Sequence, residues 1–359
     1  MKKGVIEVQF NWIFVLITGA VILFFFFSIV KTQKQFSTIK VSSSVKTDLK
    51  TILVGARAST ETASLIDLSN TEIEYDCDGY HIGDLEPISP EVGFSPSLIK
   101  GFDLMLWSLD WSVPFRATNF LYFTSPAVRY IIVDDDIASY SFAEQLNESL
   151  PPAKIIKNDE EKILMRKELI SDPSEIEDEN NYKVKFIFIN SLPSDTALTN
   201  LQGMKNEDVS AINISPKTQD LFEHGELQFY IKNDNNWNLV NSSYYIGKAS
   251  LIAAIFAEDF ERYNCNMQHA FEKLEFITTI YLNRTLILMD SYSAYNNPCK
   301  NYYYSAKTPL ENINSKSYLL SKDFSYPSSE SFVLSLKDDI PNLKKKNQNL
   351  IKYSCPEIY

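Results

Sequence analysis

An uncharged apolar segment near the amino end constrains this chain more than any other feature. Residues 10–30 read FNWIFVLITGAVILFFFFSIV. At about 1.5 Å per helical residue, this segment matches the roughly 30 Å hydrocarbon core of a bilayer. A secretory signal usually has a shorter apolar core followed by a small-x-small cleavage site, whereas KTQKQFSTIK follows here. The sequence therefore predicts a permanent transmembrane helix, with a cleaved signal as the alternative.

The residues before this segment allow a third interpretation. Lys2, Lys3 and Gly4, followed by Glu7 and a long apolar helix, resemble the class III signal of archaeal pilin-like proteins. In that family a peptidase cuts close to the glycine, and the glutamate usually lies five residues after the cut. Glu7 lies three residues after Gly4, so we favour ordinary charged flanks of a membrane helix and keep a pilin-like subunit as an alternative.

Two features of the sequence disagree about the side on which the large carboxyl part lies. The positive-inside rule favours the cytoplasm, because more lysines follow the apolar segment than precede it. Four cysteines without CxxC spacing suit two disulfides outside the cell. We favour an extracytoplasmic carboxyl domain, since an apolar segment at the extreme amino end is typical of a signal anchor. The lysines are Lys31, Lys34, Lys40, Lys46 and Lys50, and the cysteines are Cys77, Cys265, Cys299 and Cys355.

Beyond the apolar segment, helical spacing of apolar residues from Ile39 to Leu53 predicts a continuing helix that ends near Gly55, with a flexible tether as the alternative. The predicted organisation is an N-terminal flank (1–9), a transmembrane helix (10–30), a helical stalk (31–57) and an α/β domain with a C-terminal helix (58–359).

The pattern within residues 58–359 predicts the fold class. Apolar strands alternate with helical segments, which is typical of crossover units and a mixed, largely parallel sheet with flanking helices. Residues 248–282 predict one long helix, or two broken near Asn264 and Asn266. The predicted strands are 63–68 paired with 72–77, then 129–133, 154–157, 184–190, 209–215, 226–232 and 331–336, and the other predicted helices are 139–149, 163–170 and one beginning near Pro341.

Composition argues against several classes of protein. Glycine is scarce, with 10 residues, so no phosphate-binding glycine loop can be drawn. The three histidines lie far apart and no cysteine has metal-ligand spacing. The net charge is −12 without a basic patch in the body of the chain, so nucleic acid is not an expected partner.

The sharpest candidate for chemistry is the run Asp134, Asp135 and Asp136 after an apolar strand. Neighbouring carboxylates there could hold a divalent metal, because open α/β sheets place ligands at the carboxyl ends of strands. Asp134 and Asp136 resemble the DxD of haloacid-dehalogenase phosphatases and of A-type glycosyltransferases, although Ala138 departs from the phosphatase pattern. We favour a solvated strand-to-helix turn and expect no cofactor, with a metal site as the alternative.

Two structural pairings are also predicted. Cys265 lies in the long helical segment and Cys299 in the loop after it, which favours a disulfide between them and leaves Cys77 to pair with Cys355. Arg116 is a lone charge in an apolar stretch. Because a buried charge requires a partner, we predict a structural ion pair with Asp110.

Residues 10–23 and the block LWSLDWSVPFRATNFLYFTSPAVRYIIV resemble a family of single-pass membrane proteins encoded by small-genome (DPANN-type) archaea. The resemblance implies a membrane anchor and an α/β domain but no activity. We therefore expect a tethered extracytoplasmic protein, not an enzyme, whose partners are the lipid bilayer and another protein, and which either binds that partner or belongs to a cell-surface assembly. The alternatives are a membrane-anchored metal-dependent transferase or hydrolase using Asp134 and Asp136, and a pilin-like subunit.

Overall fold

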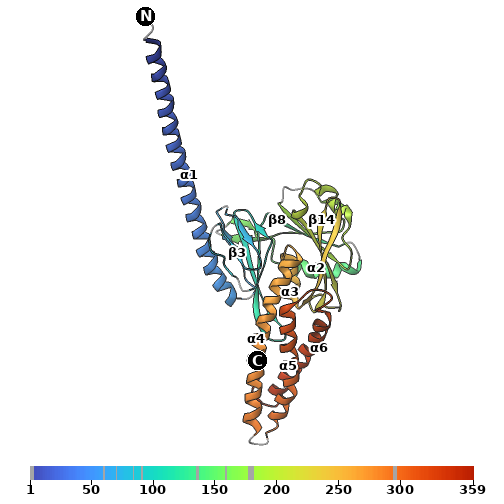
Figure 1. The fold of residues 1–359 in the computed structure, drawn as a ribbon. Helices are drawn as coiled ribbons and strands as arrows, with labels where there is room; N and C mark the ends of the chain where they lie inside the picture. Colours follow the sequence, from blue (N-terminus) through green and yellow to red (C-terminus); the bar gives the residue numbers. More distant parts are fainter. Residues whose placement is uncertain are drawn as a thin grey trace.

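The computed structural model describes residues 4–59, 61–69, 71–83, 85–89, 92–134, 137–157, 160–176, 182–293 and 297–359. It confirms the predicted fold class: an N-terminal apolar helix precedes a mixed α/β body whose main sheet is largely parallel, and helices form the carboxyl part. Figure 1 shows the first helix projecting from the body on one side, while the last three helices extend together beyond it.

Helix α1 (Gly4–Ala58) is one uninterrupted helix of 55 residues. Its segment Trp12–Lys31 is long and apolar enough to cross a membrane, and none of it is buried. The far end of the same helix is docked on the body, as Figure 1 also shows. Val45, Leu49 and Leu53, which recur every four residues on one helix face, are at most 4% exposed. The segment predicted as a stalk is thus helical, and its last turns belong to the core.

A small β unit receives this end of α1. Its four-stranded sheet has the order β1-β6-β7-β4, and a three-stranded sheet has the order β3-β2-β5. The predicted pairing of 63–68 with 72–77 is wrong, because β1 pairs with β6 and β2 pairs with β3 and β5. Alternation in a strand indicates its buried face, not its partner. The strands are β1 (Ala63–Asp67), β2 (Ile73–Tyr75), β3 (Tyr80–His81), β4 (Gly93–Phe94), β5 (Leu98–Ile99), β6 (Asp103–Ser112) and β7 (Arg116–Thr124).

The main sheet has six strands in the order β11-β8-β12-β13-β14-β15. The first four strands run parallel, and β14 pairs antiparallel with both β13 and β15. The central strands β8, β12 and β13 are almost wholly buried, which explains their continuous apolar runs. The strands are β8 (Val128–Val133), β11 (Arg166–Ile170), β12 (Lys183–Ile189), β13 (Val209–Pro216), β14 (His224–Asn233) and β15 (Asn236–Ile246).

The segment between β8 and β12 differs from the prediction. Helix α2 and strand β9 lie where they were predicted, but residues 163–170 form strands instead of a helix. Edge strand β11 is held to β8 by a bidentate ion pair, in which the Nη2 of Arg129 lies 2.6 Å from the Oε2 of Glu168. Pairing in the sheet thus overrides the helix propensity of Met, Arg, Lys, Glu and Leu. The elements here are α2 (Ile137–Ser149), β9 (Lys154–Lys157), β10 (Glu160–Ile163) and the 3₁₀ turns Pro173–Glu175, Asp195–Leu201 and Asn206–Asp208.

In the described residues after β15 the chain forms four helices. The break in the long helical segment falls between Phe256 and Phe260, not near Asn264 and Asn266. The predicted strand 331–336 is also wrong, since it forms the start of α6. Buried residues of α6 recur at helical intervals through Val333, Leu336 and Leu343, a period that six residues were too few to reveal. The helices are α3 (Lys248–Phe256), α4 (Phe260–Ser293), α5 (Cys299–Lys322) and α6 (Glu330–Lys352).

Two disulfides are present, as predicted, but with the other pairing: Cys77–Cys265 and Cys299–Cys355. Cys265 lies in the second turn of α4, beside the small β unit. About 28 residues of α4 follow Cys265, and at 1.5 Å per residue they span some 40 Å. Cys299, at the start of α5, therefore lies far from Cys265. Helix α6 returns the chain to that distant end, where Cys355 meets Cys299.

Candidate functional site

Asp134 lies directly after β8, as the sequence predicted, and is half-buried. Its backbone N–H donates to the carbonyl oxygen of Ile170 at 2.8 Å. Asp135 and Asp136 lie outside the described residues. Within the part of the chain that the structure describes, no three His, Cys, Asp or Glu side chains are grouped as metal ligands. The metal site at Asp134 and Asp136 therefore stays a prediction.

Asp110 and Arg116 lie on the neighbouring strands β6 and β7, but their side chains have other partners. Asp110 accepts a hydrogen bond from the hydroxyl of Ser112 at 2.7 Å. Arg116 donates to Oδ1 of Asn119 from Nε and Nη2 at 3.0 and 2.7 Å. Arg116 is exposed, so the premise of a buried charge was wrong. The predicted ion pair is not among the contacts of these described residues.

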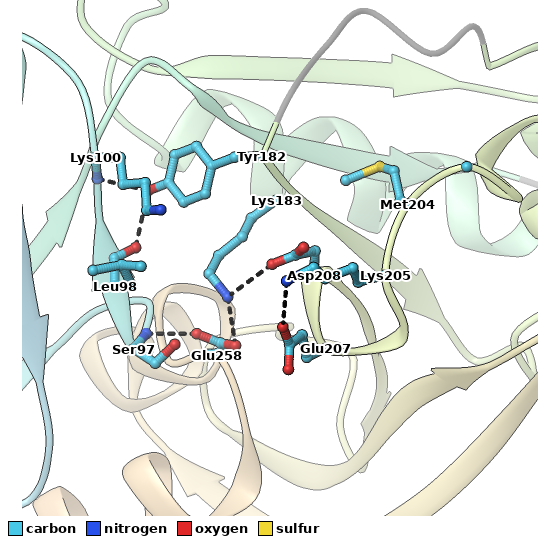
Figure 2. A pocket seen from close by; sticks show the side chains of 11 residues that line it. Ser97, Leu98, Lys100, Tyr182, Lys183, Met204, Lys205, Glu207, Asp208 and Glu258 are labelled. Carbon is cyan, nitrogen blue, oxygen red and sulfur yellow. Dashed lines mark hydrogen bonds and ion pairs between the residues drawn. The ribbon is translucent and has the colours of Figure 1, made fainter.

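A polar concavity lies at the opposite end of the parallel strands from Asp134. It has a volume of about 570 Å³, and Figure 2 shows its lining. It lies where three parts of the chain meet: the small β unit, the amino ends of β12 and β13, and the junction of α3 and α4. We call it the polar hollow, and its lining is Ser97, Leu98, Lys100, Tyr182, Lys183, Gly203, Met204, Lys205, Glu207, Asp208 and Glu258.

Lys183 is the central charge of the polar hollow. Its ammonium donates to Oε1 of Glu258 at 2.7 Å and lies 3.7 Å from Oδ1 of Asp208. The other oxygen of Glu258 accepts the backbone N–H of Ser97. The side chains of Lys183 and Glu258 are only 9% and 16% exposed. This pair therefore joins the main sheet, the helical part and the small β unit through one carboxylate (Figure 2).

The pKa of Glu258 shows which effect dominates at the pair. Burial acts to raise this pKa, but the charge of Lys183 and hydrogen bonds from Lys183 and Ser97 outweigh burial and lower it below its ordinary value. Glu258 is consequently ionised at neutral pH, and both of its oxygens are engaged. A carboxylate in this state is a weak general base, so the arrangement suits binding better than proton transfer.

Tyr182 forms the upper wall of the polar hollow in Figure 2. Its hydroxyl donates to the carbonyl oxygen of Leu98 at 3.0 Å and accepts the N–H of Lys100 at 3.2 Å. Burial raises the pKa of Tyr182, so the phenol remains a neutral donor. The phenol thus fixes strand β5 of the small β unit to the main sheet.

The rim of the polar hollow is exposed and carries both signs of charge. Lys205 and Glu207 face each other at 3.2 Å with side chains 75% and 72% exposed. Lys100 reaches Glu72 at 3.4 Å, also in solvent. Exposed pairs of this kind contribute little to stability, so they remain available to a partner.

Lys185 lies two residues beyond Lys183 on the same face of β12 and is fully buried behind the polar hollow. Its ammonium donates to the carbonyl oxygens of Ala254, at 2.9 Å, and of Ala257 at the carboxyl end of α3. Burial lowers the pKa of Lys185 to about 7. A cation at this end of α3 is favoured by the helix dipole and binds carbonyls that the helix leaves unpaired.

Sequence reasoning missed this site because its groups come from positions as far apart as Ser97 and Glu258, which are separated by 161 residues. The one available signal was the pair Lys183 and Lys185 at the start of an otherwise apolar strand. Two lysines on one face of a buried strand require partners, but the sequence does not say which.

No family model, curated protein sequence or solved structure matches this chain. The resemblance to a family of archaeal membrane proteins therefore stays a prediction, and function has to be argued from the structure.

Proposed function

We propose that this protein is a permanently membrane-anchored, extracytoplasmic binding protein whose polar hollow recognises a partner protein. The observation that carries the proposal is the continuity of α1, which runs without interruption from an apolar span into the core of the body. The disulfides and the polar hollow supply the remaining arguments.

The docking of α1 supports a permanent anchor. Val45, Leu49 and Leu53 are each at most 4% exposed, and they pack with the small β unit. Fully burying a leucine or valine contributes about 1.5–3 kcal/mol, so this end of the helix is part of the fold. The apolar span and the docked turns form one continuous helix, which is expected if the span is retained and holds the body at the membrane.

The disulfides support an extracytoplasmic body. They close separations of 188 and 56 residues, and no described cysteine is free. Disulfides persist in oxidising compartments and are rare in the cytosol. We give this argument more weight than the lysines that follow the span, because positive-inside bias acts on short loops and less on large domains.

The polar hollow supports binding. Its volume of about 570 Å³ lies within the range of ligand sites, and it forms at a junction between structural parts, where such sites often occur. Its mixed charges, carried by Lys100, Lys205 and Glu207, complement a polar segment with charges of both signs. Such segments are common on protein surfaces, so a protein partner fits the lining better than an apolar small molecule.

The placement can be tested with single cysteines introduced into the full chain, since the native cysteines are paired. Leu192→Cys in the body, where Leu192 is 70% exposed, should react with a membrane-impermeant maleimide on intact cells. Lys3→Cys, on the other side of the span, should react only after permeabilisation. The reverse pattern would place the body in the cytoplasm. The intact mass of the membrane-bound protein also decides processing, because a pilin-like cut near Gly4 removes the first residues.

Recognition can be tested by replacing Met204 in the polar hollow with photoreactive p-benzoylphenylalanine. On illuminated cells this variant should form one discrete adduct with another protein. The matched control carries the same residue at Leu192, away from the hollow, and should not form that adduct. An identical adduct from both positions, or none from Met204, would refute the polar hollow as the recognition site.

A further inference from the structure

A second, smaller pocket lies at the opposite end of α3 from the polar hollow. Its volume is about 160 Å³. It is formed by the turn between β6 and β7, the start of β14, the start of α3 and one side of α6. We call it the His224 pocket. Its polar groups come from Ser112, Glu223, His224, Gly247 and Lys337, and its apolar walls include Phe222, Val333 and Ile340.

His224 is an unusual lining residue because it is buried without a partner. It is 4% exposed, and its Nδ1 makes no hydrogen bond to any described residue. A buried polar atom without a partner costs about 1–3 kcal/mol, so such atoms in native proteins are few. Nδ1 itself is closed to solvent, so a ligand in the pocket would reach His224 through the other ring nitrogen, Nε2.

The start of α3 borders the same pocket, although the N–H of Gly247 itself donates to the carbonyl oxygen of Glu223 at 2.9 Å. Gly247 is the N-cap, and no side chain caps the helix there. Gly247 has a φ of 85°, and a Cβ built on it would meet nothing within 4 Å, so its backbone borders open space. The first-turn amides of a helix have no acceptors within the helix, and the dipole places partial positive charge there. The side chain of Lys185 binds carbonyls at the carboxyl end of α3, whereas the first turn of α3 contains no acidic residue.

The surrounding charges favour an anion. Lys337 of α6 lines the pocket, and its charge and that of Lys217 both lower the pKa of His224, after burial as the main cause. The ammonium of Lys248 lies 5.6 Å from the ring centroid of Phe222, which also lines the pocket. Glu223 opposes these charges, but its side chain is exposed. Because Lys217 is paired with Glu226 at 2.9 Å, Lys337 is the cation that the lining offers to an anion.

From this geometry we propose that the His224 pocket binds a small monocarboxylate with an apolar body. The carboxylate would accept hydrogen bonds from His224 and from Lys337 and would lie near the partial positive charge at the amino end of α3. Phe222, Val333 and Ile340 would contact the apolar body. A volume of about 160 Å³ is comparable with cavities that hold a single benzene ring. A phosphate carries more charge and no apolar body, so it fits these walls less well.

The test is calorimetric titration of the full chain in detergent with benzoate. Binding is expected, and Lys337→Met and His224→Gln should each weaken it by about tenfold, which corresponds to the loss of one charge-assisted hydrogen bond. The control Lys345→Met removes an exposed lysine from the same helix outside the pocket and should bind benzoate normally. Thermal unfolding of each variant shows that the fold is retained.

Four outcomes would overturn the proposal. These are absence of benzoate binding, equal binding of the neutral analogue benzamide, unchanged affinity in both folded variants, and preference for inorganic phosphate over benzoate. Because the titration uses only the purified chain, its result is independent of the topology and crosslinking experiments on the polar hollow.

Discussion

The buried pair of Lys183 and Glu258 makes a prediction that distinguishes a structural joint from an incidental contact. Lys183→Met removes the cation and leaves the carboxylate of Glu258, which is only 16% exposed, without its main partner. Breaking a buried pair from one side typically costs about 3–5 kcal/mol. Both groups lie at the edge of a hollow, where solvent can relax the remaining charge. We therefore expect a loss of about 2–3 kcal/mol in the free energy of unfolding.

The cycle is completed by Glu258→Gln and by the double variant. Glu258→Gln keeps an oxygen for the N–H of Ser97 but leaves Lys183 with only Asp208, at 3.7 Å. The double variant has neither unpaired charge, so it should be more stable than the sum of the single effects predicts, by about 1–3 kcal/mol. Urea unfolding of the full chain in detergent, followed by tryptophan fluorescence, measures this coupling, since Trp111 is 1% exposed.

The matched control is Lys205→Met with Glu207→Gln, a pair at 3.2 Å whose side chains are more than 70% exposed. Its coupling should be below about 1 kcal/mol. Equal coupling in the two cycles, or additive effects in the buried one, would show that the Lys183 and Glu258 pair does not hold the three parts of the chain together.

Three further predictions concern other parts of the molecule. Burial lowers the pKa of Lys185 from 10.5 to about 7, so above pH 7 the unfolded chain binds more protons than the folded one. The free energy of unfolding should therefore rise between pH 7 and 10.5 by at most about 5 kcal/mol. In urea unfolding, a Lys185→Met variant whose stability changes with pH as steeply as that of the native chain would contradict this. Titration with Mg²⁺ or Mn²⁺ should produce heat that is lost in Asp134→Ala, Asp136→Ala if the metal-dependent alternative holds, and the absence of heat would exclude it. Mass spectrometry of unreduced proteolytic fragments should find two linked pairs and no free thiol; fragments linked in any other way would refute the pairs Cys77–Cys265 and Cys299–Cys355.

Much of the fold could be predicted because several elements have strong local patterns. The uncharged span in α1 and the apolar runs of β8, β12, β13 and β14 each identify their element without knowledge of the rest. Strand β15 was missed because NWNLVNSSYYI is rich in asparagine and serine, which are poor strand formers. Its place in the sheet comes from pairing with β14 along its length, a tertiary effect that the sequence does not display.

The sites were harder to predict than the fold. Open α/β sheets usually hold ligands at the carboxyl ends of their strands, and this rule directed attention to Asp134. The polar hollow lies instead at the amino ends, where Lys183 begins β12 and Asp208 precedes β13. Its charges meet because the small β unit and the α3–α4 junction both reach that edge. The spacing of residues along the chain does not reveal contacts between segments so far apart in sequence.

Helix α3 links the two sites that we propose. Every residue from Ala249 to Phe256 is buried, so the helix can move only together with its surroundings. Its carboxyl end binds Lys185, and Glu258 follows two residues later to hold Lys183. Its amino end borders the His224 pocket. An anion bound at the amino end would interact favourably with the dipole of α3, as a charged Lys185 does at the other end. Occupation of the pocket should therefore stabilise the wall of the polar hollow.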